Sequence, residues 1–321
     1  MLHLRITAPT DLASSAVEIL EEDPAVSGLV VMPSAARKPE GDLVLADVAR
    51  EAADGVIDQL RSLGIHKEGS IHVEPVQTWL SQSAFEAEQA APGSSADTVV
   101  WAQVTQQTYE ESELNWTYLT FMTLATVLAA IAIVLDSQIL VIGAMVLGPE
   151  FVAVAALGLG LVRGRSNLFK RAVRTLLIGF LVAIAVTALA ALAARGLGWI
   201  TEADVTAERP STAFIYTPDK WSFIVALIAA AAGVLSLTSA KVGGLSGVFI
   251  SVTTVPAAGN VALGLAFGLG DEIWGSTLQL VVNLAGMAAA GWLTLAVQQV
   301  VWKRISEQRA KLVTRRRNRV A

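Results

Sequence analysis

Residues 142–160 read IGAMVLGPEFVAVAALGLG, an apolar stretch that is interrupted by Pro149 and by the carboxyl group of Glu150. A second stretch, residues 251–266, reads SVTTVPAAGNVALGLA and contains Pro256. A proline inside a helix removes a backbone hydrogen bond, and a carboxyl group in hydrocarbon is costly in free energy. Membrane helices keep such features where something polar binds or passes, so the two stretches are the first candidates for a functional site.

The chain of 321 residues changes composition at Trp116, where a mixed, acidic part gives way to long apolar runs. A helix needs about 20 apolar residues to cross a bilayer. This rule predicts an α-helical polytopic membrane protein with six spans: Trp116–Leu135, Gln138–Val162, Thr175–Ala194, Trp221–Ala240, Val242–Gly270 and Ile273–Trp302.

The basic residues are concentrated in two segments that follow predicted spans. The first is the loop after the second span, with Arg163, Arg165, Lys170, Arg171 and Arg174. The second is the tail 303–321, with Lys303, Arg304, Arg309, Lys311, Arg315, Arg316, Arg317 and Arg319. The positive-inside rule places both segments, and both termini, in the cytoplasm, and the Arg195–Lys220 loop on the other side. We expect these segments to contact anionic lipids rather than nucleic acid.

The residues before the membrane part predict a separate α+β domain over residues 1–80. Strands are expected at Leu2–Ile6, Val26–Met32, Leu43–Val48 and Ile71–Val76, and helices after Thr10 and over Ala49–Leu63, with Pro33–Gly41 as a loop. This βαββαβ order is that of a ferredoxin-like unit. Residues 81–115 follow as a linker, Ser81–Asp97, and a pre-membrane segment, Val99–Asn115.

Several chemistries are excluded or disfavoured by composition. The absence of cysteine excludes disulfides, thiol catalysis and thiolate metal sites. His3 and His72 are expected on the open face of the domain's sheet, as solvated residues rather than as metal ligands. No histidine lies in a predicted span, and no nucleophile–base pair stands out, so we expect neither a cofactor nor enzymatic activity.

The membrane part has the signs of an internal repeat, residues 116–194 and 221–302. Trp116 corresponds to Trp221, Pro149 to Pro256, and the ALGL sequence at 156–159 to that at 262–265, with an offset of about 105 residues. The alternative is chance similarity between helices rich in Ala, Leu and Gly. A repeat of three helices inverts its topology in the second copy, as in many secondary transporters, whose sites lie near the midplane at broken helices.

The candidate substrate- or ion-binding residues are grouped around the two prolines. Each proline leaves the carbonyl four residues earlier without its helical donor, and a freed carbonyl can coordinate a cation. Glu150 can carry a proton or pair with a cation, and the alternative is a protonated side chain with a structural role. The predicted set is Met145, Pro149, Glu150, Val252, Thr253, Thr254, Pro256 and Asn260, with Gln279 and Asn283 as weaker candidates.

Ile142–Pro149, the basic loop after it, and Thr253–Ala257 resemble the "uncharacterised hydrophobic domain" family of prokaryotic membrane proteins, domain of unknown function 389. The resemblance covers Val99 to Trp302 and implies a multi-pass protein of the prokaryotic plasma membrane. Many relatives carry Pro-Leu-Met-Gly-Pro where this chain has Pro-Glu-Phe-Val-Ala at 149–153. The glutamate is therefore expected to mark a subgroup with the sequence Gly-Pro-Glu-Phe.

The sequence favours a secondary transporter or ion-coupled carrier of a small solute or ion, regulated by the cytoplasmic domain and assembled as a homo-oligomer. Two alternatives remain: an oligomeric channel gated by that domain, and a membrane sensor or scaffold that transports nothing.

Overall fold

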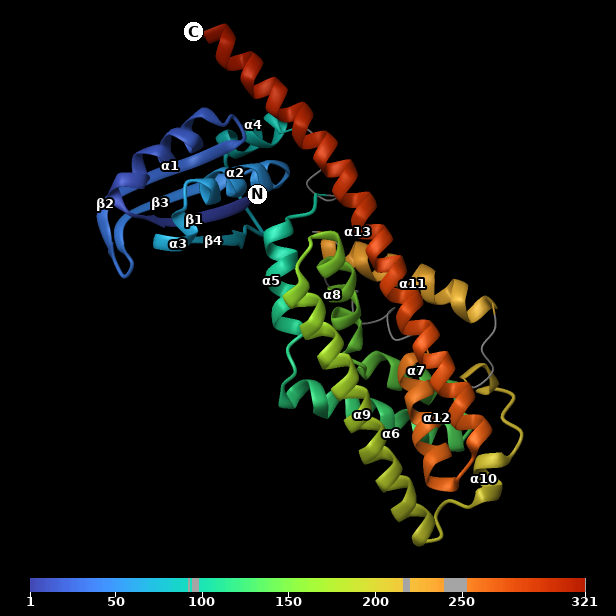
Figure 1. Ribbon diagram of the computed structural model, residues 1–321. Coiled ribbons are helices and arrows are strands. Elements are labelled where there is room, and N and C mark those ends of the chain that lie inside the picture. Colours follow the sequence, from blue (N-terminus) through green and yellow to red (C-terminus); the bar gives the residue numbers. More distant parts are fainter. Residues whose placement is uncertain (92, 94–97, 216–219, 240–252, 321) are drawn as a thin grey trace. The chain divides into compact units, whose positions relative to one another are not determined.

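A computed structural model describes residues 1–91, 93, 98–215, 220–239 and 253–320 of the chain (Figure 1). The chain forms two compact units. The head unit comprises Met1–Val104, Thr238–Lys241 and Gln298–Ala321, and the membrane unit comprises Thr105–Leu237 and Val242–Val297.

The head unit confirms the predicted βαββαβ order. Its elements are β1 (Leu2–Ala8), α1 (Thr10–Glu22), β2 (Val26–Arg37), β3 (Glu40–Val48), α2 (Arg50–Ser62), α3 (Ile65–Glu68), β4 (Ser70–Pro75) and α4 (Gln82–Ala90). The strands form one antiparallel sheet in the order β2-β3-β1-β4. Leu2, Leu4 and Ile6 alternate along β1 and are fully buried against the helices, as the period-two pattern predicts.

Two local predictions for the head differ from the structure. The predicted Pro33–Gly41 loop shrinks to Lys38 and Pro39, because Ala36 pairs with Gly41 and Arg37 pairs with Glu40. The predicted linker Ser81–Asp97 contains helix α4, whose first turn is capped by the Ser81 hydroxyl. Alanines at 84, 87 and 91 are buried, and side chains this small give little apolar signal in the sequence.

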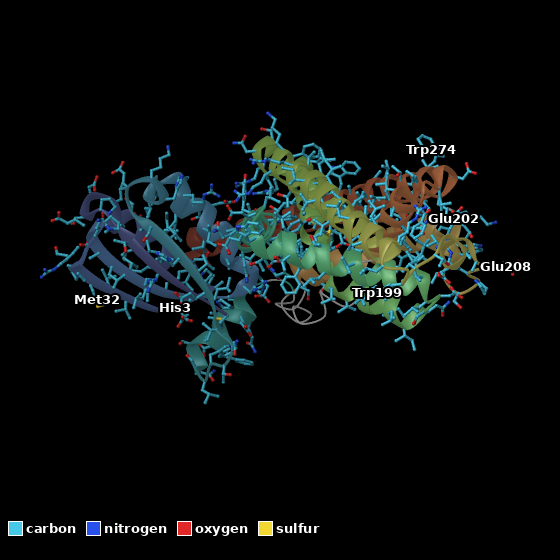
Figure 2. All side chains as sticks on the ribbon, turned by 90° about the horizontal axis from the view of Figure 1, so that it is seen from below. His3, Met32, Trp199, Glu202, Glu208 and Trp274 are labelled. Atoms are coloured by element: carbon cyan, nitrogen blue, oxygen red, sulfur yellow. The ribbon has the colours of Figure 1, made fainter. Side chains whose placement is uncertain are left out.

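The two histidines of the open sheet face do not form a pair. His3 Nδ1 lies 2.8 Å from Asp47 Oδ1, on the strand directly opposite, whereas His72 stands opposite Arg5 (His3 is labelled in Figure 2). Among the described residues, no group of three or more acidic or histidine side chains could hold a metal ion.

The membrane unit is helical. Its elements are α5 (Trp101–Glu111), which begins in the head, α6 (Trp116–Val134), α7 (Gln138–Leu147), α8 (Glu150–Val162), α9 (Ser166–Gly196), α10 (Glu202–Thr206), the 3-10 helix η1 (Ala213–Ile215), α11 (Lys220–Thr238), α12 (Thr254–Phe267) and α13 (Gly270–Val320), which ends in the head.

Three helices of the described chain are long and apolar enough to cross a membrane: α6, α9 and the Gly270–Trp302 part of α13. A fourth span results if α7 and α8 count as one, although they are bent by 54° at Gly148 and Pro149. The predicted second span is therefore a broken helix. The predicted fifth span, Val242–Gly270, is described only from residue 253 on, where α12 is a 14-residue helix.

The surfaces of these helices suit a lipid environment. Leu177, Leu181 and Leu189 of α9 are each at least 60% exposed, a row that water would disfavour and hydrocarbon accepts. Trp199 and Trp274 are exposed at one end of the unit, beside Glu202 and Glu208 (Figure 2). Exposed tryptophans next to charged residues are typical of a membrane–water interface.

Glycines set the distance between the packed helices. A Cβ atom on Gly158 of α8 would lie 2.8 Å from the backbone nitrogen of Trp292 on α13. A Cβ atom on Gly259 of α12 would lie 3.0 Å from the backbone nitrogen of Ala130 on α6. Small residues at such contacts let membrane helices approach closely, so α12 and α13 are held near α6 and α8.

Replacing Gly158 with leucine is expected to lower the thermal stability of the detergent-solubilised protein, because the neighbouring atoms are backbone and cannot rotate away. Overpacking of this kind costs about 1–3 kcal/mol. Gly196→Leu is the matched control, since nothing lies within 4 Å of a Cβ atom there. Equal melting temperatures for the two variants would contradict the close contact between α8 and α13.

Candidate functional site

The break between α7 and α8 places Glu150 at the start of a helix. Gly148 is extended (φ −67°, ψ 124°), Pro149 is the N-cap residue of α8, and Glu150 is its first helical residue. The missing N–H of a proline costs little at a helix start, where the N–H groups have no helical partner in any case. The sequence therefore places the break and the carboxyl group at the same point.

The predicted free carbonyl of Met145 is in fact partly satisfied. Pro149 has no N–H to donate to it, but the N–H of Gly148 donates instead, with an N···O distance of 3.4 Å. This long bond closes the last turn of α7, so Met145 is a weaker candidate for cation coordination than the sequence indicated.

Pro256 lies in the first turn of α12 rather than in the interior of a helix. Thr253 is the N-cap residue, Thr254 begins the helix, and the N–H of Ala257 donates to the carbonyl of Thr253 at 3.1 Å. Val252, the other predicted free carbonyl, lies outside the described residues. Thr253 has a φ of 62°, which is uncommon for a β-branched residue, and strained backbone of this kind often occurs at functional sites.

The first turns of α8 and α12 meet at the Glu150 carboxyl group. The Thr254 hydroxyl donates a hydrogen bond to Glu150 Oε1 with an O···O distance of 2.6 Å, and both residues are fully buried. Helix N-termini carry a partial positive charge, so α8 and α12 both stabilise a negative charge on Glu150. The structure thus brings together two of the predicted residues that are about a hundred positions apart in the sequence.

Helix α13 adds a third element to this group. The side-chain amide of Asn283 donates to the Thr253 hydroxyl, and Asn283 is fully buried. Glu150, Thr254, Thr253 and Asn283 therefore form one buried polar group, which we call the Glu150 cluster. Asn283 was only a weaker candidate in the sequence, because its distance from Pro256 along the chain hides its contact with Thr253.

Asn260 belongs to a different group of residues. Its side-chain oxygen accepts from Arg209 Nη1 at 3.2 Å, and its nitrogen donates to the Ser276 hydroxyl at 2.8 Å. Arg209, which is 4% exposed, also forms an ion pair with Glu272, with an N···O distance of 2.6 Å. The sequence did not indicate Arg209 or Ser276, since one lies in a loop of mixed charge and the other is a single serine.

The depth of Glu150 can be derived from the α8–α9 hairpin, whose helices lie side by side (Figure 1). Gly160 on α8 packs against Phe169 on α9. Because the two helices of the hairpin run in opposite directions, Glu150, ten residues before Gly160, lies at the same depth as Gly179, ten residues after Phe169. The apolar part of α9, Thr175–Ala194, is about 30 Å long, and Gly179 lies about 6 Å from its start. Glu150 is therefore nearer to the end with the basic loop than to the predicted midplane.

A cavity of about 330 Å³ lies against the α7–α8 break. It is lined by Glu110, Glu111, Asn115, Thr117, Tyr118, Phe121, Gly148, Pro149, Phe151 and Val152. The lining includes two carboxylates of α5 and no basic residue, so the cavity favours cations over anions. Tyr118 and Phe151 stand between the cavity and the core, and the buried Tyr118 hydroxyl has no hydrogen-bond partner among the described residues.

The opposite end of the unit is closed by the loop that precedes α11. Asp136, in the turn between α6 and α7, accepts from the Thr212 hydroxyl at 2.9 Å and from the Ser211 N–H at 3.2 Å. Arg195 donates to the carbonyl of Ala266 at 2.9 Å and lies 5.0 Å from the centre of the Phe267 ring. The loop is therefore attached to the turn after α6 through Asp136 and to α12 through Arg209, while Arg195 joins the ends of α9 and α12.

Residues 145–289 match the family model described as Domain of unknown function (DUF389). The match includes Pro149 and Pro256, the Glu150 cluster and the Arg209 group, and it leaves out residues 1–104 and 298–321 of the head unit. No curated protein and no solved structure matches the chain.

Replacing Thr254 with valine is expected to destabilise the protein, because the isosteric side chain leaves a buried carboxyl oxygen without its donor. Removal of one partner of a buried hydrogen bond costs about 1–3 kcal/mol. Thr254→Ser keeps the hydroxyl and should retain most of the wild-type melting temperature. A serine variant as unstable as the valine variant would show that packing, rather than the hydrogen bond, matters at this position.

The loop contact of Asp136 is expected to weaken in acid. Desolvation alone raises the pKa of Asp136, but the hydrogen bonds from Thr212 and Ser211 together outweigh it and hold the pKa below its usual value. A lowered folded-state pKa stabilises the protein above the unfolded-state pKa of about 4, and this contribution is lost as the pH falls through the folded-state pKa. The difference in melting temperature between wild type and Asp136→Asn should therefore shrink from pH 6 to pH 3. A difference independent of pH would contradict this role.

Proposed function

We propose that this chain, which belongs to the DUF389 family, is a secondary transporter in which Glu150 binds and releases a proton while a small solute or ion is carried across the membrane. The observation that carries the proposal is the buried hydrogen bond between Glu150 and Thr254, which joins the first turns of two helices. An ionisable residue at such a position is by default a functional residue, because burying it is costly.

Thr254 suits a group that changes its protonation state. Its hydroxyl donates to the carboxylate in the structure, and the same oxygen can accept a hydrogen bond from the carboxylic acid after a rotation of the hydroxyl. The two helix N-termini favour the charged form, and the surrounding apolar side chains favour the neutral form. A proton carrier needs surroundings that can stabilise each of its two forms, and Glu150 has groups of both kinds around it.

The acidic cavity would give protons and cations access to Glu150 from the side of the membrane that carries the basic loop. It reaches Gly148 and Pro149, the residues directly before Glu150, and its two glutamates raise the local concentration of cations. The short distance between Glu150 and that end of α9 agrees with this route. Movement at the bend between α7 and α8 would open or close the passage from the cavity to Glu150, past Tyr118 and Phe151.

The whole arrangement fits a carrier built from an inverted repeat of six spans. Helices α8 and α12 have 13 and 14 residues, and each has its proline at or near its first turn, as corresponding half-helices would. In this proposal rocking of one repeat against the other changes the contact between Glu150 and Thr254. The protein would work as a homo-oligomer of a prokaryotic plasma membrane with both termini in the cytoplasm, its basic segments on anionic lipids, and the head unit regulating transport.

Purified protein in liposomes tests the proposal. A pH gradient is imposed, Na⁺, K⁺, chloride and phosphate are supplied one at a time, and the internal pH is followed with a dye. Wild type should show saturable, gradient-driven flux with at least one of these ions, and Glu150→Gln should abolish it at an unchanged melting temperature. Glu202→Gln, on the exposed helix α10, is the matched control and should behave as wild type.

Three other outcomes would overturn the proposal. Equal flux in wild type and Glu150→Gln would remove Glu150 from the mechanism. Unitary currents in planar bilayers, without saturation, would identify a channel. No flux with any of these ions would favour the sensor or scaffold hypothesis.

A further inference from the structure

We propose that a water-filled proton path runs along one face of α13, from the Arg209–Glu272 ion pair to the Glu150 cluster, and that Gln279 holds the water in it. The inference rests on the proposed role of Glu150 as a proton carrier. It adds the route to Glu150 from the end opposite the acidic cavity.

The path begins with a row of polar side chains on α13. Glu272, Ser276, Gln279 and Asn283 are spaced by four, three and four residues, which places them on one face of the helix. The last three are at most 1% exposed, so the row faces protein rather than lipid. The row is about 16 Å long, roughly half the thickness of the hydrocarbon layer.

Helix α12 runs antiparallel to this row and contacts it at both ends. Asn260 donates to Ser276, and Thr253 accepts from Asn283, so the two contacts are seven residues apart on each helix. Midway between them, Gln279 lies level with Ala257 and Pro256. Neither of these residues has a side-chain donor or acceptor, and Pro256 also lacks a backbone N–H.

Gln279 is therefore a buried amide opposite an apolar surface. Among the described residues, neither its side-chain nitrogen nor its side-chain oxygen has a hydrogen-bond partner, and the same holds for the side-chain oxygen of Asn283. Leaving such a group unsatisfied in the protein interior is costly in free energy. Buried water normally satisfies groups of this kind and needs two to four polar partners, which these three atoms supply.

Water at Gln279 would complete a continuous polar connection. In order, its members are Glu272, Arg209, Asn260, Ser276, Gln279, Asn283, Thr253, Thr254 and Glu150. Direct hydrogen bonds join the members at both ends, and water is needed between Ser276 and Asn283 and between the two threonine hydroxyls. Arg209 and the amide groups only position and close the path, because they cannot accept a proton and pass it on. The relay itself runs through water and the hydroxyls of Ser276, Thr253 and Thr254, each of which accepts one proton and releases its own. Glu150, at the inner end, is the proposed proton carrier, so a proton is the species that we assign to this connection.

The Arg209–Glu272 ion pair closes this path at its outer end. Both side chains are largely buried, Arg209 also bonds to Asn260, and the loop that carries Arg209 is held by Asp136 through Ser211 and Thr212. The guanidinium group repels an incoming proton. In this structure the path is therefore shut at the Arg209 end, while the acidic cavity borders the α7–α8 break from the other side.

The absence of cysteine makes the path directly testable. Single variants Gln279→Cys and Leu278→Cys are reconstituted in liposomes and treated with a membrane-impermeant methanethiosulfonate. Leu278 is the matched control, because it is 43% exposed on the lipid side of α13. The reaction needs the thiolate, whose fraction falls about tenfold for each unit by which desolvation raises the thiol pKa. We expect the thiol at position 279 to react at least about tenfold faster than that at position 278.

The gate is tested by adding Glu272→Gln to the Gln279→Cys variant. Loss of the ion pair should increase the reaction rate at position 279 by about tenfold, as the water column gains contact with the bulk. Folding of each variant is checked by its melting temperature, and Ser276→Cys, at the next turn, provides a second probe should Gln279→Cys not fold. Equal rates at 279 and 278, or at 276 and 278, would overturn the path.

Functional and structural failures are distinguishable. If wild type carries protons and Glu150→Gln does not, but the thiols at 276 and 279 react no faster than that at 278, only the path is wrong. If these thiols react as expected but no proton flux is found, the water-filled path stands and the proposed transport function fails. Gln279→Leu, which removes the side-chain amide group that would hold the water, should lower gradient-driven flux. Unchanged flux would also overturn the path.

Discussion

The hydrogen bond between Thr254 and Glu150 is the interaction on which the membrane unit depends. A carboxyl group buried among apolar helices is costly unless dipoles or hydrogen bonds compensate for it. Here the compensation comes from the first turns of α8 and α12 and from the Thr254 hydroxyl. The two helices must therefore start at the same place in the fold, although about a hundred residues separate them in the chain.

The first turns of α8 and α12 can lie together only if the neighbouring helices pack closely around them. Glycine and alanine at the contacts of α12 with α6, and of α8 with α13, allow the backbones to approach closely. Buried polar residues form two hydrogen-bonded groups, around Glu150 and around Arg209, and a row on the α13 face between them. Leu177, Leu181 and Leu189 of α9 face outward. The unit is thus polar where helices meet and apolar where lipid is expected, the reverse of a water-soluble protein.

Much of the fold was predictable from local patterns. Period-two alternation in β1 and the length of the apolar runs identified the head sheet, α6 and α9. The short alanine-rich helix α4 was not predicted from the sequence, because its buried face is built from small side chains that give little apolar signal. Pro149 marked the start of α8, but the bend of 54°, the closed last turn at Met145 and the location of Glu150 toward one end of α9 depend on how the helices pack.

The sequence by itself determined which residues near the prolines are candidates for the site, because a charge or a proline in an apolar run stands out against its neighbours. Residues 145–289 also match the DUF389 family model. Only the tertiary structure decided the partners. In the folded protein Glu150 is hydrogen-bonded to Thr254, and Asn260 is hydrogen-bonded to Arg209 and lies outside the Glu150 cluster. Gln279 is buried opposite an apolar surface. The physical reason is that hydrogen bonds between helices depend on depth and rotation in the packed unit, and neither quantity is encoded by distance along the chain.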